Sequence, residues 1–275
     1  MFTRVITSCL FARAVALAPA TARPPRNRAT APWDPLDFIQ TAGGVANKLH
    51  PVLNHLSPAP GRVLDIGCAL GPDLIRSGYD VRGMDVDARQ VANARVRGVP
   101  AVIGDAQVCF PPELRPRALF DAVVSLEALN HVPHTSAVVN NVASVLKTEG
   151  IFAGECGGAG TCAGALLAVA DVLGDVVVER LNPWTFPAPG ELRCLLHAAG
   201  FRDVVVTSSP RPVQCTAVEW YRTFGKVFLE SVPVADRAAF LDDYRTACAH
   251  RLGGENRLDF VRLRWRAVRR DDRSR

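Results

Sequence analysis

Hydrophobic and polar residues follow one another along most of the chain in blocks that change period. Short strand-like runs such as "RVLDI" at 62–66 and "FDAVV" at 120–124 are followed by segments with the wider apolar spacing of helices. Strands that alternate with helices are typical of a parallel sheet with helices on both faces. The pattern therefore predicts an α/β fold, with a doubly wound and mostly parallel sheet.

Seven strands are expected from this pattern. They are predicted over residues 62–66, 80–85, 100–105, 120–129, 151–155, 201–208 and 258–268. Helices are predicted from Pro72 onward and over 88–97, 134–147 and 190–200. Asp87 followed by Gln90 has the spacing of a capping box at a helix start, and Gly200 fits a helix end.

The interval before the last strand breaks this alternation. Within it Phe240, Leu241, Tyr244 and Cys248 recur at helical spacing on one face. Two helices inserted between edge strands would form a cap over one end of the sheet. The expected organisation is an extension at 1–33 and one domain at 34–275, with 211–256 as its helical cap.

Charge is distributed unevenly along the chain. The formal net charge is +5, but residues 1–33 hold five arginines and no acidic residue, and the rest holds 27 basic and 27 acidic side chains. A neutral body argues against a broad nucleic-acid surface. The acid-free start is typical of an organelle transit peptide, with a disordered tail or an early start codon as alternatives. The expected location is the cytoplasm, or the mitochondrial matrix if 1–33 is such a peptide.

Cysteine spacing and hydropathy exclude further classes. The eight cysteines form no C-x-x-C pair, which favours free thiols over a disulfide framework or a zinc site. No charge-free apolar run reaches the ~18 residues that a membrane-spanning helix needs. We therefore expect no metal, no membrane span and no nucleic-acid partner.

The stretch "LDIGCALGPDL" at 64–74 carries the first chemical signal. It joins a strand to a turn in which Gly67 and Gly71 flank small residues, and Asp65 lies at the strand end. A nicotinamide-binding turn has G-x-G-x-x-G, whereas Ala69 occupies the position of the middle glycine. The Asp65 carboxylate would repel a pyrophosphate and suits a ligand that carries positive charge.

Three further motifs follow along the chain: "RGMDVD" at 82–87, "GDA" at 104–106 and "FDAVVSLEALNHV" at 120–132. With these four motifs in the family's order, the chain resembles the class I S-adenosylmethionine-dependent methyltransferases from Arg62 to about Arg269. The resemblance implies a Rossmann-like fold and S-adenosylmethionine as cofactor. The implied cofactor residues are Asp65, Gly67, Cys68, Ala69 and Gly71 in the first loop, Asp85 and Val86 after the second strand, Gly104, Asp105 and Ala106 after the third, and Ser125 and Leu126 in the fourth.

The same resemblance implies a role for several of these residues. Gly67 and its neighbours would lie against the methionine end, and Asp85 would accept from both ribose hydroxyls. Val86 would lie beside the adenine, and Asp105 would accept from its amino group. The chain departs from the family pattern at Ala69, and the helix after this loop is about one turn shorter than expected.

Later segments resemble the subgroup that includes trans-aconitate methyltransferase. They are "GECGGAGTCAGAL", "NPWTFPAPGELRCLLHAAGF", "WYRTFGKVFLESVP" and "FVRLRWRAVRR". In that subgroup a helical insert before the last strand closes over the acceptor. The resemblance favours a small-molecule acceptor, with a carboxylic acid among the candidates.

Methyl transfer mainly requires that the acceptor be held in line with the donor, and orientation alone can supply ~7–11 kcal/mol. A base is optional for a carboxylate acceptor and helps a hydroxyl or an amine. The candidates for a catalytic base are His131 and His134 in "NHVPH", with ordinary surface roles as the alternative. Candidates for the acceptor pocket are the aromatic residues Trp184, Trp220 and Tyr221 and the arginines Arg180, Arg211 and Arg222.

Two other functions stay open at this point. A nicotinamide-dependent oxidoreductase is disfavoured by the glycine spacing and by Asp65. A non-catalytic cofactor-binding subunit is favoured by the short first helix. The predicted function is methyl transfer from S-adenosylmethionine to a small-molecule acceptor, with the acceptor, the methylated atom and the oligomeric state left open.

Overall fold

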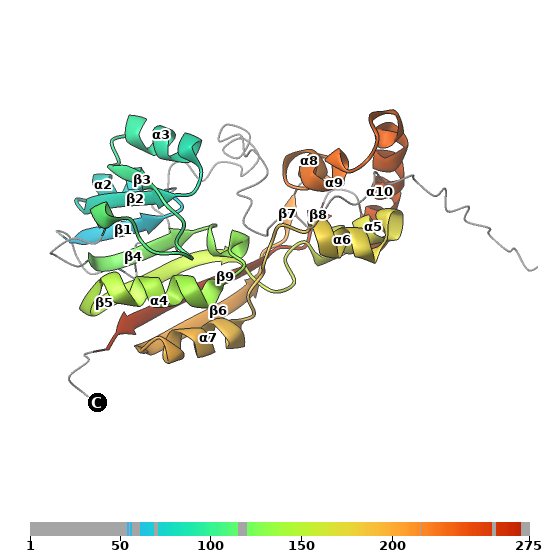
Figure 1. Cartoon of the computed structure of the whole chain (residues 1–275). Helices are drawn as coiled ribbons and strands as arrows, with labels where there is room; N and C mark the ends of the chain where they lie inside the picture. Colours follow the sequence, from blue (N-terminus) through green and yellow to red (C-terminus); the bar gives the residue numbers. More distant parts are fainter. Residues whose placement is uncertain are drawn as a thin grey trace, which may run out of the picture.

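A seven-stranded sheet forms the centre of the molecule in the computed structural model (Figure 1). The structure describes residues 54, 56, 61–68, 71–114, 120–214, 216–254 and 257–270. The predicted extension at 1–33 and Ala69 in the first loop lie outside the described residues.

The strands follow the order β3-β2-β1-β4-β5-β9-β6. Their bounds are β1 (Arg62–Ile66), β2 (Asp80–Asp85), β3 (Ala101–Ile103), β4 (Phe120–Leu126), β5 (Leu146–Gly157), β6 (Phe201–Pro210) and β9 (Val261–Arg269). The first five pair in parallel, and β9 runs antiparallel to both β5 and β6. The prediction of a mostly parallel seven-stranded sheet is confirmed.

Helices cover both faces of this sheet. The helices α2 (Gly71–Arg76) and α3 (Ala88–Val96) pack on one face, and α4 (Thr135–Val145) and α7 (Pro189–Ala198) pack on the other. The Asp87 carboxylate caps α3 by accepting from the Arg89 backbone N–H at 2.8 Å. The doubly wound arrangement therefore follows the predicted alternation of strands and helices.

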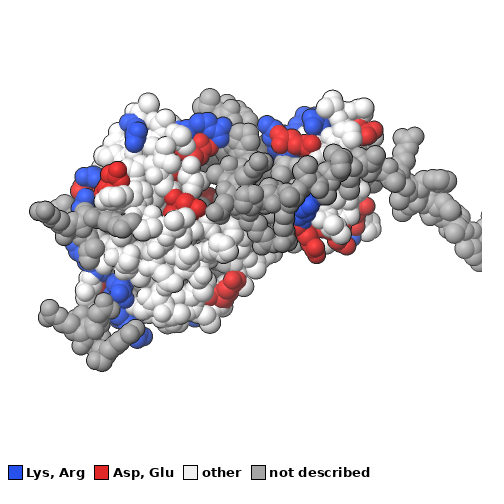
Figure 2. Space-filling model, viewed as in Figure 1, with Lys and Arg blue, Asp and Glu red and all other residues white. Residues whose placement is uncertain are grey.

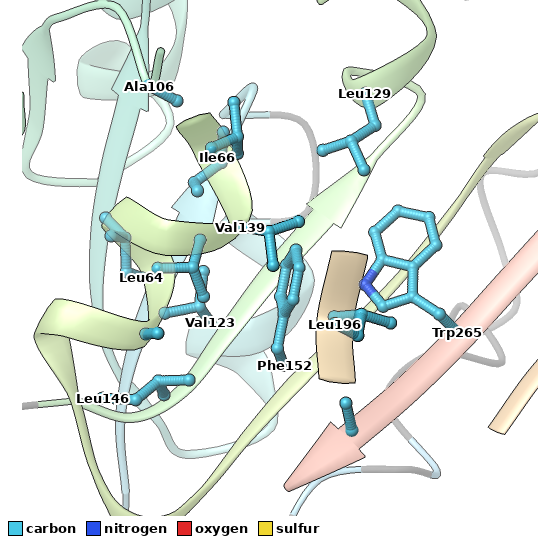
Figure 3. Packing of buried hydrophobic residues seen from close by; sticks show 14 of the residues in the cluster. Leu64, Ile66, Ala106, Val123, Leu129, Val139, Leu146, Phe152, Leu196 and Trp265 are labelled. Atoms are coloured by element: carbon cyan, nitrogen blue, oxygen red, sulfur yellow. The ribbon is translucent and has the colours of Figure 1, made fainter. Parts of the chain in front are cut away.

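Side chains alternate between two cores along each strand. Leu64 faces the α4 and α7 side, and its neighbour Val63 faces the α2 and α3 side, both fully buried. In the larger core, which Figure 3 shows from close by, the rings of Phe152 and Trp265 meet edge to face with centroids 5.5 Å apart. Such a pair stabilises by about 0.5–1.5 kcal/mol beyond the area it buries.

The bounds of the neighbouring strands β5 and β9 differ from the predicted ones. β5 begins at Leu146, which pairs with Phe120 across a register shift, so the strand is longer than expected. β9 begins at Val261 because Arg257–Leu258 (β8) leaves the sheet and pairs with Val213–Gln214 (β7) in a separate antiparallel ribbon.

The predicted cap interval contains three helices, α8 (Ala217–Thr223), α9 (Lys226–Glu230) and α10 (Arg237–Leu252), with a 3-10 turn η5 (Val234–Asp236). Two helices that the sequence pattern did not reveal, α5 (Ala163–Leu173) and α6 (Asp175–Leu181), pack against them beside the ends of β6 and β9 (Figure 1). α5 is apolar almost throughout, so it has no polar face whose period could be read.

Charged side chains of both signs share the face of the molecule seen in Figure 2. Figure 2 shows basic and acidic side chains in small mixed groups over the face in view. Within the described ranges no helix has the length and apolar character needed to cross a bilayer, and His, Cys, Asp and Glu form no metal-binding group of three or more. No disulfide joins any two of the six described cysteines.

Replacement of Gly154 by alanine should destabilise the fold. A Cβ at this β5 position would lie 2.1 Å from a ring carbon of Trp265 and 2.4 Å from the backbone oxygen of Ser125. Such overpacking costs about 1–3 kcal/mol of unfolding free energy, or more against backbone atoms. Urea denaturation followed by circular dichroism measures the loss.

The matched control is Gly190→Ala on α7, where a Cβ would meet no atom within 4 Å. Alanine is the better helix former by up to about 1 kcal/mol, so this variant should be neutral or slightly more stable. Equal unfolding midpoints for the two variants would contradict the packing described around β5.

Candidate functional site

The carboxyl ends of the parallel strands meet at one edge of the sheet. From β1 the chain proceeds to β2 and β3 on one side, and from β4 it proceeds to β5 on the other. β1 and β4 are neighbours, and the loops that follow them therefore lead in opposite directions along the sheet. Open α/β sheets bind ligands at such a switch point.

Backbone hydrogen bonds join the loops at this edge to the adjacent strands. The Gly67 N–H donates to the Met84 oxygen at 2.8 Å, and the Gly104 N–H donates to the Asp85 oxygen at 2.9 Å. On the other side of the switch point, the Glu127 N–H donates to the Glu155 oxygen at 2.8 Å. Each loop thus leaves its strand in a fixed direction.

The loops after β1 and β4 touch each other. Gly67 has a φ of +98°, and a Cβ there would lie 2.8 Å from the Cβ of Ala128. Cys68 and Glu127, which follow these two strands, also have positive φ angles of 49° and 53°. Non-glycine residues in this conformation cluster at functional sites because the surrounding structure must hold them there.

Three predicted cofactor residues come together beneath these loops. Asp65 is fully buried, and Asp85 is partly buried with its Oδ1 accepting from the Asp87 N–H at 2.9 Å. Burial raises the pKa of Asp85. Burial, and then the carboxylates of Asp65 and Asp85, raise the pKa of Cys68, so its thiol stays protonated.

The loop after β3 is attached to α4. Asp105 accepts from the Gln107 N–H at 2.8 Å, and the Gln107 side-chain oxygen accepts from the His134 N–H at 2.9 Å. The Ala106 side chain lies in the hydrophobic core, while its backbone oxygen accepts from the Asn141 amide at 2.8 Å. Of the residues predicted here, Asp105 stands nearer to solvent than Ala106 does.

The fourth strand and the loop after β2 have contrasting exposure. Ser125 is fully buried, and its hydroxyl has no hydrogen-bond partner in the described part of the chain, while Leu126 is partly buried. Val86 is 46% exposed, Ile103 at the end of β3 is 57% exposed and Val108 is 68% exposed. These apolar side chains face solvent on the β2 and β3 side of the edge.

The two predicted histidines differ in their surroundings. His131 ends the 3-10 turn η4 (Leu129–His131), and burial lowers the pKa of its imidazole to about 4. The ring is therefore neutral near pH 7 but a weak proton acceptor. His134 is exposed and precedes α4.

The loop between α6 and α7 connects η4 to the cap. The Thr185 N–H donates to the Asn130 oxygen at 2.7 Å, and the flanking rings of Trp184 and Phe186 stack with centroids 6.1 Å apart. Trp184, a predicted pocket residue, is partly buried here. The other predicted aromatics, Trp220 and Tyr221, lie in the core of the cap.

Sequence reasoning missed an ionic cluster at the ends of β4, β5 and β9. It is formed by Glu127, Glu155, Arg262 and Arg264, together with the predicted Arg211. The arginines at every second position of the last strand, in "VRLRWRAVR", were the signal that could have indicated it. The predicted Arg180 and Arg222 are exposed on α6 and α8.

Comparisons with known proteins agree on one kind of domain. A family model described as a methyltransferase domain matches residues 42–206. An uncharacterized methyltransferase of Schizosaccharomyces pombe is 26% identical over 216 residues, which cover 73% of this chain and 83% of the relative.

A ubiquinone biosynthesis O-methyltransferase of Paramagnetospirillum magneticum is 33% identical over 147 residues, and the match spans 50% of this chain and 58% of that enzyme. Among solved structures, the YcgJ protein of Bacillus subtilis superimposes with a TM-score of 0.53 at 18% identity, over 80% of this chain and 96% of that one. This structural likeness concerns the fold.

The lowered pKa of His131 predicts a pH dependence of stability. The unfolded chain binds a proton at this residue near pH 6.5, and the native state does so only near pH 4. Stability from His131 is therefore fully present above pH 6.5 and is lost as the pH falls toward 4. His131→Gln should reduce the acid loss of unfolding free energy by about 1–3 kcal/mol.

Urea denaturation at several pH values between 7 and 4 measures this change. His134→Gln removes an exposed imidazole three residues away and is the matched control. A pH profile that is equally flattened in both variants, or in neither, would contradict the burial of His131.

Proposed function

This chain belongs to the methyltransferase domain family and is an S-adenosylmethionine-dependent methyltransferase, and from that premise we propose that it methylates an oxygen atom of a small molecule. The single observation that carries the small-molecule acceptor is the hydrogen bond from Thr185 to Asn130. It holds an aromatic loop directly beside the turn after β4. A large polymer would have to displace this loop.

The residues at the strand ends fit the cofactor chemically. We assign the ribose hydroxyls to Asp85, and the adenine to the exposed apolar side chains of Val86 and Ile103. Asp65 and the bare backbone at Gly67 suit the positively charged methionine end. Asp65 does not suit a pyrophosphate, in agreement with the family assignment over the oxidoreductase alternative. When bound, S-adenosylmethionine supplies an electrophilic methyl group.

An acceptor that is already ionised suits the side chains nearby. In an in-line transfer an oxygen lone pair forms the new C–O bond as the C–S bond breaks, and a carboxylate or phenolate has no proton to lose. His131, with its pKa lowered to about 4, would remove a hydroxyl proton poorly near pH 7. We therefore propose that His131 lines the site as a neutral ring and does not act as a general base.

The comparisons support oxygen as the methylated atom. The relatives in which identity reaches 33% are named O-methyltransferases of ubiquinone biosynthesis, and this chain spans about half of their length. The segments that resemble the trans-aconitate methyltransferase subgroup also favour an acidic oxygen, although none of these relatives carries that name. We propose O-methylation without choosing between these subgroups.

Methyl transfer to a panel of small molecules tests the proposal. Purified protein, labelled S-adenosylmethionine and separate sets of carboxylic acids, phenols and amines should give labelled product with the acids or phenols. Release of the label by mild alkali identifies a methyl ester, whereas an ether retains it. Transfer to amines alone, or to none of the panel while S-adenosylhomocysteine binds, would contradict the proposal.

Asp85→Asn should separate cofactor binding from stability. Because the folded pKa of Asp85 is raised, the stability that this group contributes is present at low pH and is lost as pH rises through that value. At pH 7 the variant without cofactor should be as stable as the wild type or more stable. Its affinity for S-adenosylhomocysteine should fall about tenfold or more, since a hydrogen bond to a charged group is worth ~1.5–3 kcal/mol.

Calorimetric titration measures the affinity for S-adenosylhomocysteine, and thermal denaturation measures the stability of the protein without cofactor. Asp80→Asn, at the opposite end of β2 and exposed, is the matched control and should leave affinity unchanged. Unchanged affinity in Asp85→Asn would remove this residue from the cofactor site.

A further inference from the structure

An ionic cluster lies where the sheet passes into the cap. Glu127 follows β4, Glu155 lies on β5, and Arg262 and Arg264 lie at alternate positions of β9. Glu155 and Arg264 are direct partners across the β5 and β9 ladder. Arg211 joins them from the end of β6, where its backbone N–H donates to the Phe260 oxygen at 2.7 Å.

Glu155 is the centre of this cluster and is only 1% exposed. Its Oε2 accepts from the Nε of Arg264. Its Oε1 lies 3.6 Å from the Nε of Arg262 and 3.7 Å from the Nη1 of Arg211, both too long for hydrogen bonds. Burying a carboxylate requires compensating positive charge, and Arg264 provides the hydrogen-bonded part of it.

The three guanidinium groups differ in how they are used. Arg264 bonds Glu155, and the Nη1 of Arg262 bonds Glu127. The guanidinium of Arg211 makes no hydrogen bond with the described residues, and its side chain is 51% exposed. Among the described side chains of the cluster, three positive charges thus face two negative ones, and Arg211 holds the surplus at the rim.

The cluster adjoins the acceptor side of the site. Glu127 precedes Ala128, which touches Gly67 in the cofactor loop, and Glu155 pairs with Leu126 at the end of β4. β6 and β9 extend from here toward the cap (Figure 1). Arg211 follows β6, and β5 and β9 lie between β6 and the switch point in the sheet order. Asp85, at the end of β2, lies on the other side of the switch point.

We propose that the methyl acceptor carries a negatively charged group and that Arg211 binds this group at the place where the sheet passes into the cap. The inference rests on the proposed small-molecule methyl transfer and adds the charge of its substrate. Arg262 and Arg264 act as positioning residues, because their bonds to Glu127 and Glu155 hold the cluster in place. Arg211 is the most exposed of the three arginines, and its guanidinium hydrogen-bonds no described residue, so it can engage a carboxylate or another anion in a bidentate way.

Matched pairs of acceptors test the charge directly. Each pair has one hydroxylated acid and its carboxamide, for example 3,4-dihydroxybenzoate and 3,4-dihydroxybenzamide, and a short aliphatic hydroxy acid with its amide forms a second pair. Calorimetric titration into the protein saturated with S-adenosylhomocysteine measures binding without turnover. The wild type should bind at least one acid about tenfold or more tightly than its amide, since a charged hydrogen bond is worth ~1.5–3 kcal/mol.

Variants then assign this preference to one side chain. Arg211→Gln should remove the preference for the acid while leaving affinity for the amide and for S-adenosylhomocysteine unchanged. Arg211→Lys should restore part of it, because lysine keeps the charge and loses the planar fork. Arg245→Gln, which removes an arginine of similar exposure on α10, is the matched control and should retain the full preference.

Several outcomes overturn the inference. Equal wild-type affinity for acid and amide, no binding of any acid at millimolar concentration, or an unchanged preference in Arg211→Gln would each do so. A uniform loss of affinity for every ligand, with a lower melting temperature, would assign Arg211 a structural role only. If the proposed function alone is wrong, the wild type still binds the acid more tightly than the amide, but no methyl group is transferred to any acceptor.

Discussion

The contact between Gly67 and Ala128 is the constraint on which the site depends. It joins the first residue after β1 to the loop after β4, and these two strands are the point where the chain divides toward opposite edges of the sheet. A Cβ at Gly67 would lie 2.8 Å from the Cβ of Ala128, so only a bare backbone fits. Cys68 and Glu127, which lie beside this contact on the two loops, both adopt left-handed backbone conformations.

The two sides of this contact are built for different chemistry. Toward β2 and β3 the edge offers the carboxylate of Asp85 and exposed apolar side chains such as Val86. Toward β5 and β9 it offers Glu155 among arginines, with aromatic rings from the loop at 182–188. Under the proposed function, a cofactor with a ribose and a flat base occupies the first side and the acceptor approaches from the second.

Sequence pattern was sufficient for most of the sheet and insufficient for the cap. β1 and β2 have the predicted bounds because their apolar runs end at a glycine turn or a capped helix. α5 was missed because apolar side chains such as Leu167 also occupy its exposed side, so it has no polar period. The cofactor motifs could be read because their residues are close together in sequence. The pairing of Glu155 with Arg264 joins positions 109 apart, and no local pattern carries that information.

The histidines illustrate why residue type alone is a poor guide to a base. "NHVPH" offers two imidazoles directly after β4, yet the short η4 turn leaves one partly buried and the other is exposed before α4. The partly buried ring loses basicity because its surroundings solvate the cation poorly. The weak basicity of His131 agrees with the proposal that the acceptor arrives already ionised. An anionic acceptor needs a compensating cation, and the arginines of the last strand and of β6 stand at the edge where that charge would be held.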